Sequence, residues 1–171
     1  EKTETRPSGQ ISCPVVAALG GAEPSGAIGA MVAADPSPNA TLAALGEHFR
    51  DPEWQLIDSI AFSSMRKWAM CDFGENGLFY LGAPEILLRE DDQTNRDRVE
   101  TLANEGKRIL VLTRSESPTS KTDELPTSRT QVCLIFLEDT LREDAHEIFS
   151  YLQGQGIQLK VISGDHPATV A

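Results

Sequence analysis

Cysteine is scarce in this sequence and is not arranged for pairing or for holding a metal. The three cysteines, which are far apart and odd in number, are Cys13, Cys71 and Cys133. None of them is spaced as in a Cys-x-x-Cys motif, and the three histidines are equally scattered. A disulfide framework or a zinc site is therefore not expected, and a reducing compartment fits the sequence best.

Basic residues are also in deficit, with 15 lysines and arginines against 26 aspartates and glutamates, which gives a net charge of -11. Such a chain gains little from the phosphate neutralisation that drives nucleic-acid binding, so no nucleic-acid partner is expected. It would also be repelled by an anionic membrane surface. A small anionic ligand is not excluded, because a few local cations can hold one phosphate.

Long apolar runs are missing as well. No stretch reaches the roughly 18 residues of a membrane-spanning helix, and the first ten residues are too polar for a signal peptide. We therefore expect the chain itself to be soluble, whatever the nature of its parent protein. Its 40% hydrophobic and 24% charged residues are typical of a globular protein. Its 171 residues suffice for one domain and part of a second.

The first half of the sequence predicts helices before strands. Residues 1–14 are expected to be extended, and the Ala- and Gly-rich residues 15–34 to form one or two short helices. The segment 35–39 contains two prolines and breaks the chain direction. Asn39 or Thr41 can then cap a further helix.

The middle of the sequence alternates strands and helices. A strand is predicted within 54–62, followed by a hairpin whose Asn76 and Gly77 supply the positive-φ residues of a tight turn. The remaining predicted elements are the hairpin strands 67–73 and 78–81, a short helix from Pro84, a helix over 97–104 that stops at Gly106, a strand over 108–112 and an exposed loop over 115–130.

The last forty residues predict a parallel βαβ unit. Residues 132–137 and 157–162 are apolar runs, and apolar residues recur at helical spacing over 145–152. Ser163, Gly164 and Asp165 follow the second run, at the position where open α/β sheets bind ligands. An ordinary strand–turn–helix junction explains the same residues.

Two further segments carry residue types suited to a phosphate-containing ligand. Phe62 is followed by Arg66 and Lys67, so a ring can stack on a base while two cations attract phosphates. The start of a surface strand with exposed cations explains these residues equally. Gly82 and Ala83 can admit a flat ring against the backbone, or they can simply form a tight turn.

The order and spacing of five segments resemble the P-type cation-transporting ATPase family, most closely an actinobacterial subgroup of cation pumps. The segments are 60–67, 81–85, 106–110, 139–142 and 163–165. In that family a nucleotide-binding domain is inserted into a haloacid-dehalogenase-like phosphorylation domain. The resemblance implies that the chain is the ATP-binding cytoplasmic part of a pump in the plasma membrane.

The resemblance also implies roles for individual residues. Phe62 would stack on adenine, Arg108 would reach the phosphates or ribose, and Gly82 would line the base pocket. The full nucleotide-binding set that it implies is Phe62, Ser63, Arg66, Lys67, Gly82, Ala83 and Arg108. The implied hinge and phosphate set, which would act with Mg²⁺, is Asp139, Arg142, Ser163, Gly164 and Asp165. The expected partners are ATP and the remaining phosphorylation, actuator and transmembrane domains.

Several residues depart from the family pattern. Leu81 stands at the position of a lysine, and Thr140 at that of the hinge proline. Glu1 stands at the position of the phosphorylated aspartate, and its extra methylene misplaces the attacking oxygen. Glu4 adds negative charge beside the phosphate. We therefore expect that the isolated chain forms no phosphoenzyme, holds no metal, and is a piece of a longer protein.

The fold expected overall is α/β. Residues 13–130 would form an α+β nucleotide-binding domain with a mostly antiparallel sheet flanked by helices. Residues 1–12 would be a remnant of the start of the phosphorylation domain, and residues 131–171 a fragment of its parallel sheet. Two other functions remain open: a catalytically inactive regulatory or interaction domain of the same fold, and a free-standing phosphatase, which Glu1 disfavours.

Overall fold

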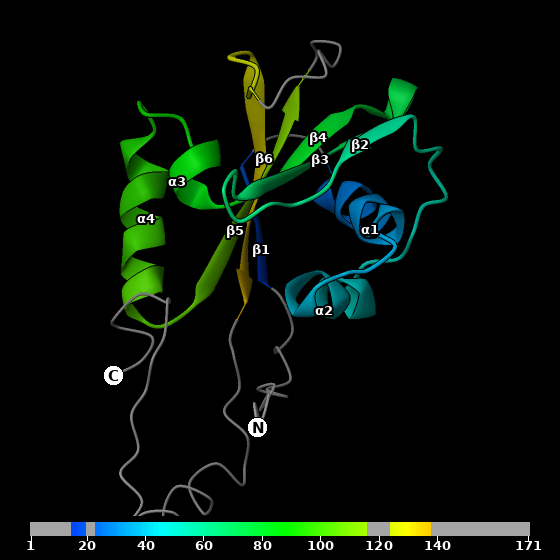
Figure 1. The fold of residues 1–171 in the computed structure, drawn as a ribbon. Helices are drawn as coiled ribbons and strands as arrows, with labels where there is room; N and C mark the ends of the chain where they lie inside the picture. The colour runs from blue at the N-terminus through cyan, green and yellow to red at the C-terminus, as the bar shows by residue number, and fades with distance from the viewer. Residues whose placement is uncertain (1–14, 20–22, 116–123, 138–171) are drawn as a thin grey trace, which may run out of the picture.

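A computed structural model describes residues 15–19, 23–115 and 124–137 (Figure 1). These residues form six strands and four α-helices. In chain order the elements are β1 (Val15–Ala18), α1 (Pro24–Ala34), α2 (Ala40–His48), β2 (Asp58–Ile60), β3 (Trp68–Asp72), β4 (Leu78–Gly82), α3 (Pro84–Leu87), α4 (Gln93–Asn104), β5 (Arg108–Ser115) and β6 (Arg129–Leu137). Among the described helices, none is both long and apolar enough to cross a membrane.

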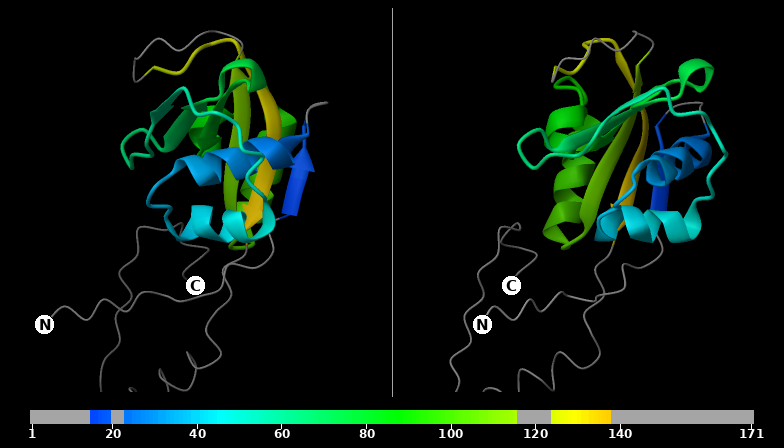
Figure 2. Two further views of the ribbon diagram at one scale, coloured as in Figure 1. Left: turned by 90° about the vertical axis from the view of Figure 1, so that its right-hand side faces the viewer. Right: turned by 45° about the vertical axis from the view of Figure 1, so that its right-hand side comes forward.

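All six strands belong to one sheet in the order β1-β6-β5-β4-β3-β2, and each neighbouring pair is antiparallel. Helices α1 and α2 cover one face of this sheet, and α3 and α4 lie against the other (Figures 1 and 2). The expectation of a mostly antiparallel sheet flanked by helices is confirmed.

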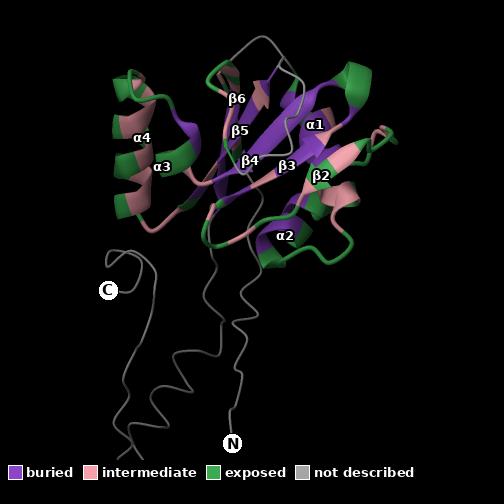
Figure 3. Ribbon diagram, turned by 45° about the horizontal axis from the view of Figure 1, so that its top comes forward, coloured by how far each residue is buried: buried purple, intermediate pink, exposed green. Residues whose placement is uncertain are grey.

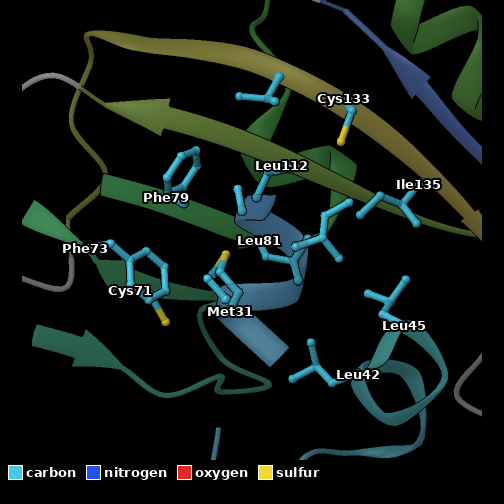
Figure 4. Close-up of a cluster of buried hydrophobic side chains, with 14 of the residues drawn as sticks. Met31, Leu42, Leu45, Cys71, Phe73, Phe79, Leu81, Leu112, Cys133 and Ile135 are labelled. Atoms are coloured by element: carbon cyan, nitrogen blue, oxygen red, sulfur yellow. The ribbon is translucent and has the colours of Figure 1, made fainter. Parts of the chain in front are cut away.

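Side chains alternate between two cores along each central strand, because successive residues of a strand point to opposite faces. On β6, for example, Cys133 and Ile135 pack beneath α1 and α2, whereas Leu134 and Phe136 pack on the side of α3 and α4. The central strands are therefore buried on both faces, whereas the edge strands β1 and β2 contain no buried residue (Figure 3). Figure 4 shows the first of these cores, in which Met31 and Leu45 from the helices meet Leu112 and Ile135 from the sheet.

The predicted hairpin is confirmed, with β3 and β4 joined by a 3-10 turn over Gly74–Asn76. Gly77 has the predicted positive φ, at 120°, but the second positive-φ residue of the turn is Gly74, at 58°, and not Asn76. The Phe73 amide donates to the Gly77 carbonyl at 3.0 Å and closes the turn. Both positive-φ positions of this turn are therefore glycines.

Helices α2 and α4 each begin directly after a residue whose side chain caps the helix. The Asn39 side chain accepts a hydrogen bond from the Leu42 amide at 3.0 Å, which is the predicted cap of α2. Helix α4 begins at Gln93, earlier than the predicted start at 97, because Asp92 caps it by accepting from the Asn95 amide. Residues 93–96, which precede the predicted start, are polar and show no apolar periodicity. The chain leaves α4 through Gly106, whose φ is 80°.

Two predicted elements differ from the structure in type or length. Residues 15–34 do not form only helices, since Val15–Ala18 is strand β1 and pairs with β6. The strand predicted over 54–62 is limited to Asp58–Ile60.

The apolar run 132–137 is a strand, as predicted, but it does not begin a separate parallel sheet. It lies within β6 between β1 and β5 and is antiparallel to both. The antiparallel sheet therefore continues past the domain boundary expected at residue 131. The predicted helix and second strand of the βαβ unit, the remnant expected over 1–12, and residues 138–171 as a whole lie outside the described residues.

The contact between α1 and the chain beyond α2 requires a glycine. A Cβ on Gly29 would overlap the carbonyl oxygen of Arg50. We expect Gly29→Ala to lower the free energy of unfolding in urea by about 2 kcal/mol, because overpacking outweighs the gain in helix propensity. Gly46→Ala is the matched control: its Cβ would meet only a Val32 methyl at 3.0 Å, and its effect should stay within about 0.5 kcal/mol. Equal effects of the two variants would contradict this packing.

Candidate functional site

A cavity of about 470 Å³ lies where α1 and α2 meet β2 to β5. Its lining is largely apolar, and its inner wall continues into the core shown in Figure 4, where Met31, Leu42, Cys71 and Leu81 are buried. The polar residues of the lining are Asp35, Asn39, Thr41, Ser59 and Arg108. A cavity of this size, apolar with a few polar groups, is typical of a small-molecule site.

Phe62 contributes an unusually exposed aromatic ring to this cavity. Its side chain lines the cavity directly after β2, and the residue keeps 47% of its surface exposed. Large aromatic residues are usually much more buried, as Phe73 and Phe79 are in the adjacent core. The exposed ring therefore offers a flat apolar surface on which a planar group can stack.

Arg108 lines the cavity and is hydrogen-bonded to a second lining residue, Thr41. Its Nη1 donates to the Oγ1 of Thr41 at 2.9 Å, although the two residues are 67 positions apart in the sequence. Thr41 is buried, with 9% of its surface exposed, and it lies in the first turn of α2 behind the Asn39 cap. The hydrogen bond therefore connects α2 to the start of β5 at the cavity.

The turn after Phe62 is held by hydrogen bonds of its own residues. The Ser63 Oγ accepts from the amides of Met65 and Arg66 at 3.2 and 3.4 Å. The Arg66 Nη2 donates to the Ala61 carbonyl at 2.7 Å, and the guanidinium lies 5.4 Å from the centre of the Trp68 ring. Ser63 and Arg66 are absent from the cavity lining. Their observed contacts fix the segment that carries Phe62.

Lys67 and Ala83 also lie outside the lining. The Lys67 Nζ forms an ion pair with Glu85 at 2.8 Å, and both side chains are about half exposed. Burial alone would raise the pKa of Glu85, but the hydrogen bond from Lys67, a backbone hydrogen bond and the charge of Lys67 together outweigh it, so that the pKa is lowered. The Ala83 amide donates to the Lys67 carbonyl at 2.9 Å and thereby fixes the start of α3.

Gly82 lines the cavity, and its lack of a side chain is required by the sheet. It pairs with Trp68, and a Cβ at Gly82 would overlap the Lys67 carbonyl oxygen and lie 2.7 Å from the Trp68 Cα. The tight approach therefore occurs between β3 and β4. This close approach requires a glycine at position 82, and Gly82 also lines the cavity.

The cavity thus brings together three of the seven residues predicted for nucleotide binding: Phe62, Gly82 and Arg108. The other predicted site residues, Glu1, Asp139, Arg142, Ser163, Gly164 and Asp165, lie outside the described residues. Within the described ranges, no group of three or more His, Cys, Asp and Glu side chains is placed to hold a metal ion.

Sequence reasoning missed the polar contribution of the segment 35–41 to this cavity. Asp35, Asn39 and Thr41 were interpreted only as a chain break and a helix cap. The proline-containing segment 35–39 is the signal that could have been used, because it places polar residues directly before the N-terminus of α2. Cys71 was missed too; burial, and to a lesser extent the charge of Asp35, raises the pKa of its thiol to about 12.

Comparison with known proteins gives a consistent set of relatives. The chain is 34% identical over 144 residues to a calcium-transporting ATPase, CtpE, of Mycobacterium tuberculosis, a match that covers 84% of this chain and 18% of the relative. It is 33% identical over 137 residues to CtpE of Mycolicibacterium smegmatis, covering 80% of this chain and 17% of the relative. A probable cation-transporting ATPase, exp7, of Streptococcus pneumoniae is 35% identical over 135 residues, covering 78% of this chain and 17% of the relative.

The fold is similar to part of a zinc-transporting PIB-type ATPase whose crystal structure has been solved. The TM-score is 0.55 at 16% sequence identity, and the match covers 92% of this chain and 24% of that one. No family model matches the sequence. The chain spans less than a fifth of the length of the curated relatives it matches.

The hydrogen bond between Thr41 and Arg108 gives a direct test of how the cavity is held. We expect Thr41→Val to lower the free energy of unfolding in urea by about 1 kcal/mol, because the isosteric side chain leaves the guanidinium without this acceptor. Thr41→Ser retains a hydroxyl and should preserve the hydrogen bond. In an Arg108→Gln background the difference between Val and Ser at position 41 should vanish. A difference that persists there would show that the contact is not the cause.

Proposed function

We propose that this chain, which is homologous to one segment of the P-type cation-transporting ATPases, binds ATP in the cavity between α1, α2 and the sheet. The observation that carries the proposal is that an exposed aromatic ring, Phe62, and a guanidinium, Arg108, line one apolar cavity. These are the two residues for which the family resemblance implies contacts with adenine and with the phosphates or ribose.

The adenine base would stack on Phe62 and lie against the apolar wall. Stacking of a base on an aromatic side chain is worth about 1–3 kcal/mol. One ring and one lining guanidinium provide few further contacts, so the expected dissociation constant is high micromolar to millimolar, or about 4–5 kcal/mol of binding free energy. The chain would present ATP rather than hold it tightly.

In the intact pump, the bound ATP would deliver its γ-phosphate to an aspartate of the phosphorylation domain. Catalysis of such a transfer rests on positioning and on the stabilisation of charge, with Mg²⁺ on the phosphates. The phosphorylation, actuator and transmembrane domains would be the partners, with this chain on the cytoplasmic side of the plasma membrane. Alone it would hydrolyse nothing, because Glu1 stands at the position of the phosphorylated aspartate.

A second function of the same fold is favoured by one residue. Leu81 lies in the cavity lining at the position of the family's lysine, which removes an ammonium from the site. A domain that kept the fold as a regulatory or interaction module, without a ligand, would show this kind of loss. Binding of ATP by the isolated chain separates the two functions.

The Phe62→Ala variant tests the proposed site. We expect it to abolish measurable ATP binding in a calorimetric titration, because it removes the stacking surface while the described core stays intact. The matched control is Met65→Ala, which truncates a 92% exposed apolar side chain of the same loop that does not line the cavity. The control should bind ATP as the unmodified chain does.

The two variants also define the contrary result. Unchanged affinity in Phe62→Ala would exclude Phe62 as the base-stacking residue. Equal losses in both variants would mean that the loop, rather than the ring, supports binding. Absence of ATP binding in the unmodified chain would favour the regulatory or interaction module.

A further inference from the structure

We propose that the outer edge of strand β2 is a docking surface for an extended segment of another protein, one that carries basic residues between apolar ones. The segment would pair with β2 and add a further strand to the sheet, the mode of recognition known as β-augmentation. This inference does not depend on the binding of a nucleotide in the cavity. It rests on the place of β2 in the sheet, on the side chains along it and on the charges at one end of it.

Strand β2 ends the sheet on one side. In the order β1-β6-β5-β4-β3-β2 it is the last member, and among the described strands it pairs with β3 alone. Its three residues are intermediate or exposed, as their colours in Figure 3 show. The N–H and C=O groups on the outer side of such a strand can pair with a strand of another chain.

Apolar side chains are exposed along this edge. Among the described residues six large hydrophobic residues are exposed, and three of them, Leu56, Ile57 and Phe62, lie within residues 56–62, which contain β2. Phe62 lines the cavity, whereas Leu56 and Ile57, with 39% and 59% of their surface exposed, do not. Many natural edge strands are protected from pairing by a lysine or a proline, and residues 56–62 contain neither. The edge is therefore open to an apolar strand.

Two carboxylates face each other across the β2–β3 ladder. Asp58 lies directly opposite Asp72, and like charges in such a pair repel each other. The Asp58 Oδ1 accepts from the Ser59 amide at 2.9 Å, a neutral donor that leaves the charge in place. Glu75 is exposed in the turn that follows β3. Among the described residues, no cation pairs with Asp58 or Glu75. This end of the edge therefore attracts a positive charge.

These observations define the chemistry of the partner. Main-chain hydrogen bonds to β2 require an extended segment, and Leu56 and Ile57 favour apolar side chains on it. A lysine or arginine of the segment placed beside Asp58 would offset its repulsion with Asp72. The net charge of -11 would also steer a basic segment toward this chain.

The place of β2 favours a separate protein over the rest of the parent chain. The strands that connect to residues before 15 and after 137 are β1 and β6, which are neighbours at the other side of the sheet. Val15 pairs with Phe136, so both connections leave at the same end of these two strands. Five inter-strand spacings of about 4.8 Å, or about 24 Å in all, separate β1 from β2. The β2 edge therefore lies away from both connections.

A hydrogen-exchange experiment on the full 171-residue chain tests the docking surface. The probe is a capped heptapeptide of alternating valine and lysine at about 1 mM, a concentration at which a few main-chain hydrogen bonds give measurable binding. We expect the peptide to slow exchange of the amides of residues 56–62 by about fivefold and to leave those of β1 unchanged.

Two further peptides serve as controls in this experiment. One has glutamate in place of lysine, and the other keeps its lysines but has proline in place of the two inner valines, so that it cannot pair along its length. Neither should protect residues 56–62. Equal protection by the proline peptide would reduce the effect to charge attraction and would overturn the inference. So would protection centred on β1, or no protection by the valine–lysine peptide.

Reversal of the charge at position 58 tests the role of the carboxylate pair. Asp58→Lys should weaken binding of the valine–lysine peptide by at least about tenfold and should allow the glutamate peptide to bind. Glu90→Lys is the matched control, because it changes the net charge equally at an exposed residue between α3 and α4. It should alter the affinity by less than about twofold. Equal losses in the two variants would contradict a specific role for Asp58.

A milder variant decides if circular dichroism shows that Asp58→Lys does not fold. Asp58→Asn should raise the midpoint of urea unfolding, because it removes the repulsion with Asp72. It should also weaken the valine–lysine peptide by about threefold. Unchanged affinity for the peptide in Asp58→Asn would overturn the proposed partner chemistry.

Discussion

Burial of the sheet on both faces is the constraint on which the rest of this structure depends. The central strands must be apolar on each side because helices α1 and α2 cover one face and α3 and α4 the other. Val111 and Leu112, adjacent residues of β5, are both fully buried and belong to opposite cores. Little of the central sheet is therefore available to a ligand. The cavity beside Phe62 lies where α1 and α2 meet β2 to β5.

The cavity is built by contacts that begin at a helix cap. Asn39 fixes the first turn of α2, and this turn sets Thr41 against Arg108 on β5. On the other wall, hydrogen bonds of Ser63 and Arg66 fix the turn that leaves the Phe62 ring exposed. The two presenting segments are thus held by separate local networks. The ring and the guanidinium meet at one cavity because the sheet is common to both.

The sequence predicted the elements whose signals are local. The Asn39 cap, the β3–β4 hairpin and the short helix at Pro84 each depend on residues within a few positions, and each is confirmed. Strand β6 was predicted but placed in the wrong kind of sheet. Its continuous apolar run is typical of a parallel strand, and an antiparallel strand covered on both faces produces the same pattern. Strand β1 was missed because its two valines are followed by alanines and glycines, and its pairing with β6 is a long-range contact.

The contrast between local signals and long-range contacts also applies to the site. Phe62, Gly82 and Arg108 were predicted from motif positions and line one cavity. Ser63, Arg66 and Lys67 were also predicted as ligand contacts and lie outside the lining. Ser63 accepts from backbone amides and Lys67 pairs with Glu85, and residue type alone does not reveal such contacts. Asp35 and Thr41 were missed because their partners lie on other elements. Motif positions therefore led to three residues that line one cavity, and the three-dimensional contacts show how the other described residues of the predicted set are held.

A map of backbone amide NMR shifts of the full chain during a titration with ATP, with GTP as the control, tests directly whether ATP binds in this cavity. If ATP binds there, we expect shifts clustered at Phe62, Gly82 and Arg108, larger for ATP than for GTP at equal concentration. Absence of shifts at millimolar ATP, or shifts confined to the α3–α4 side of the sheet, would contradict ATP binding in this cavity.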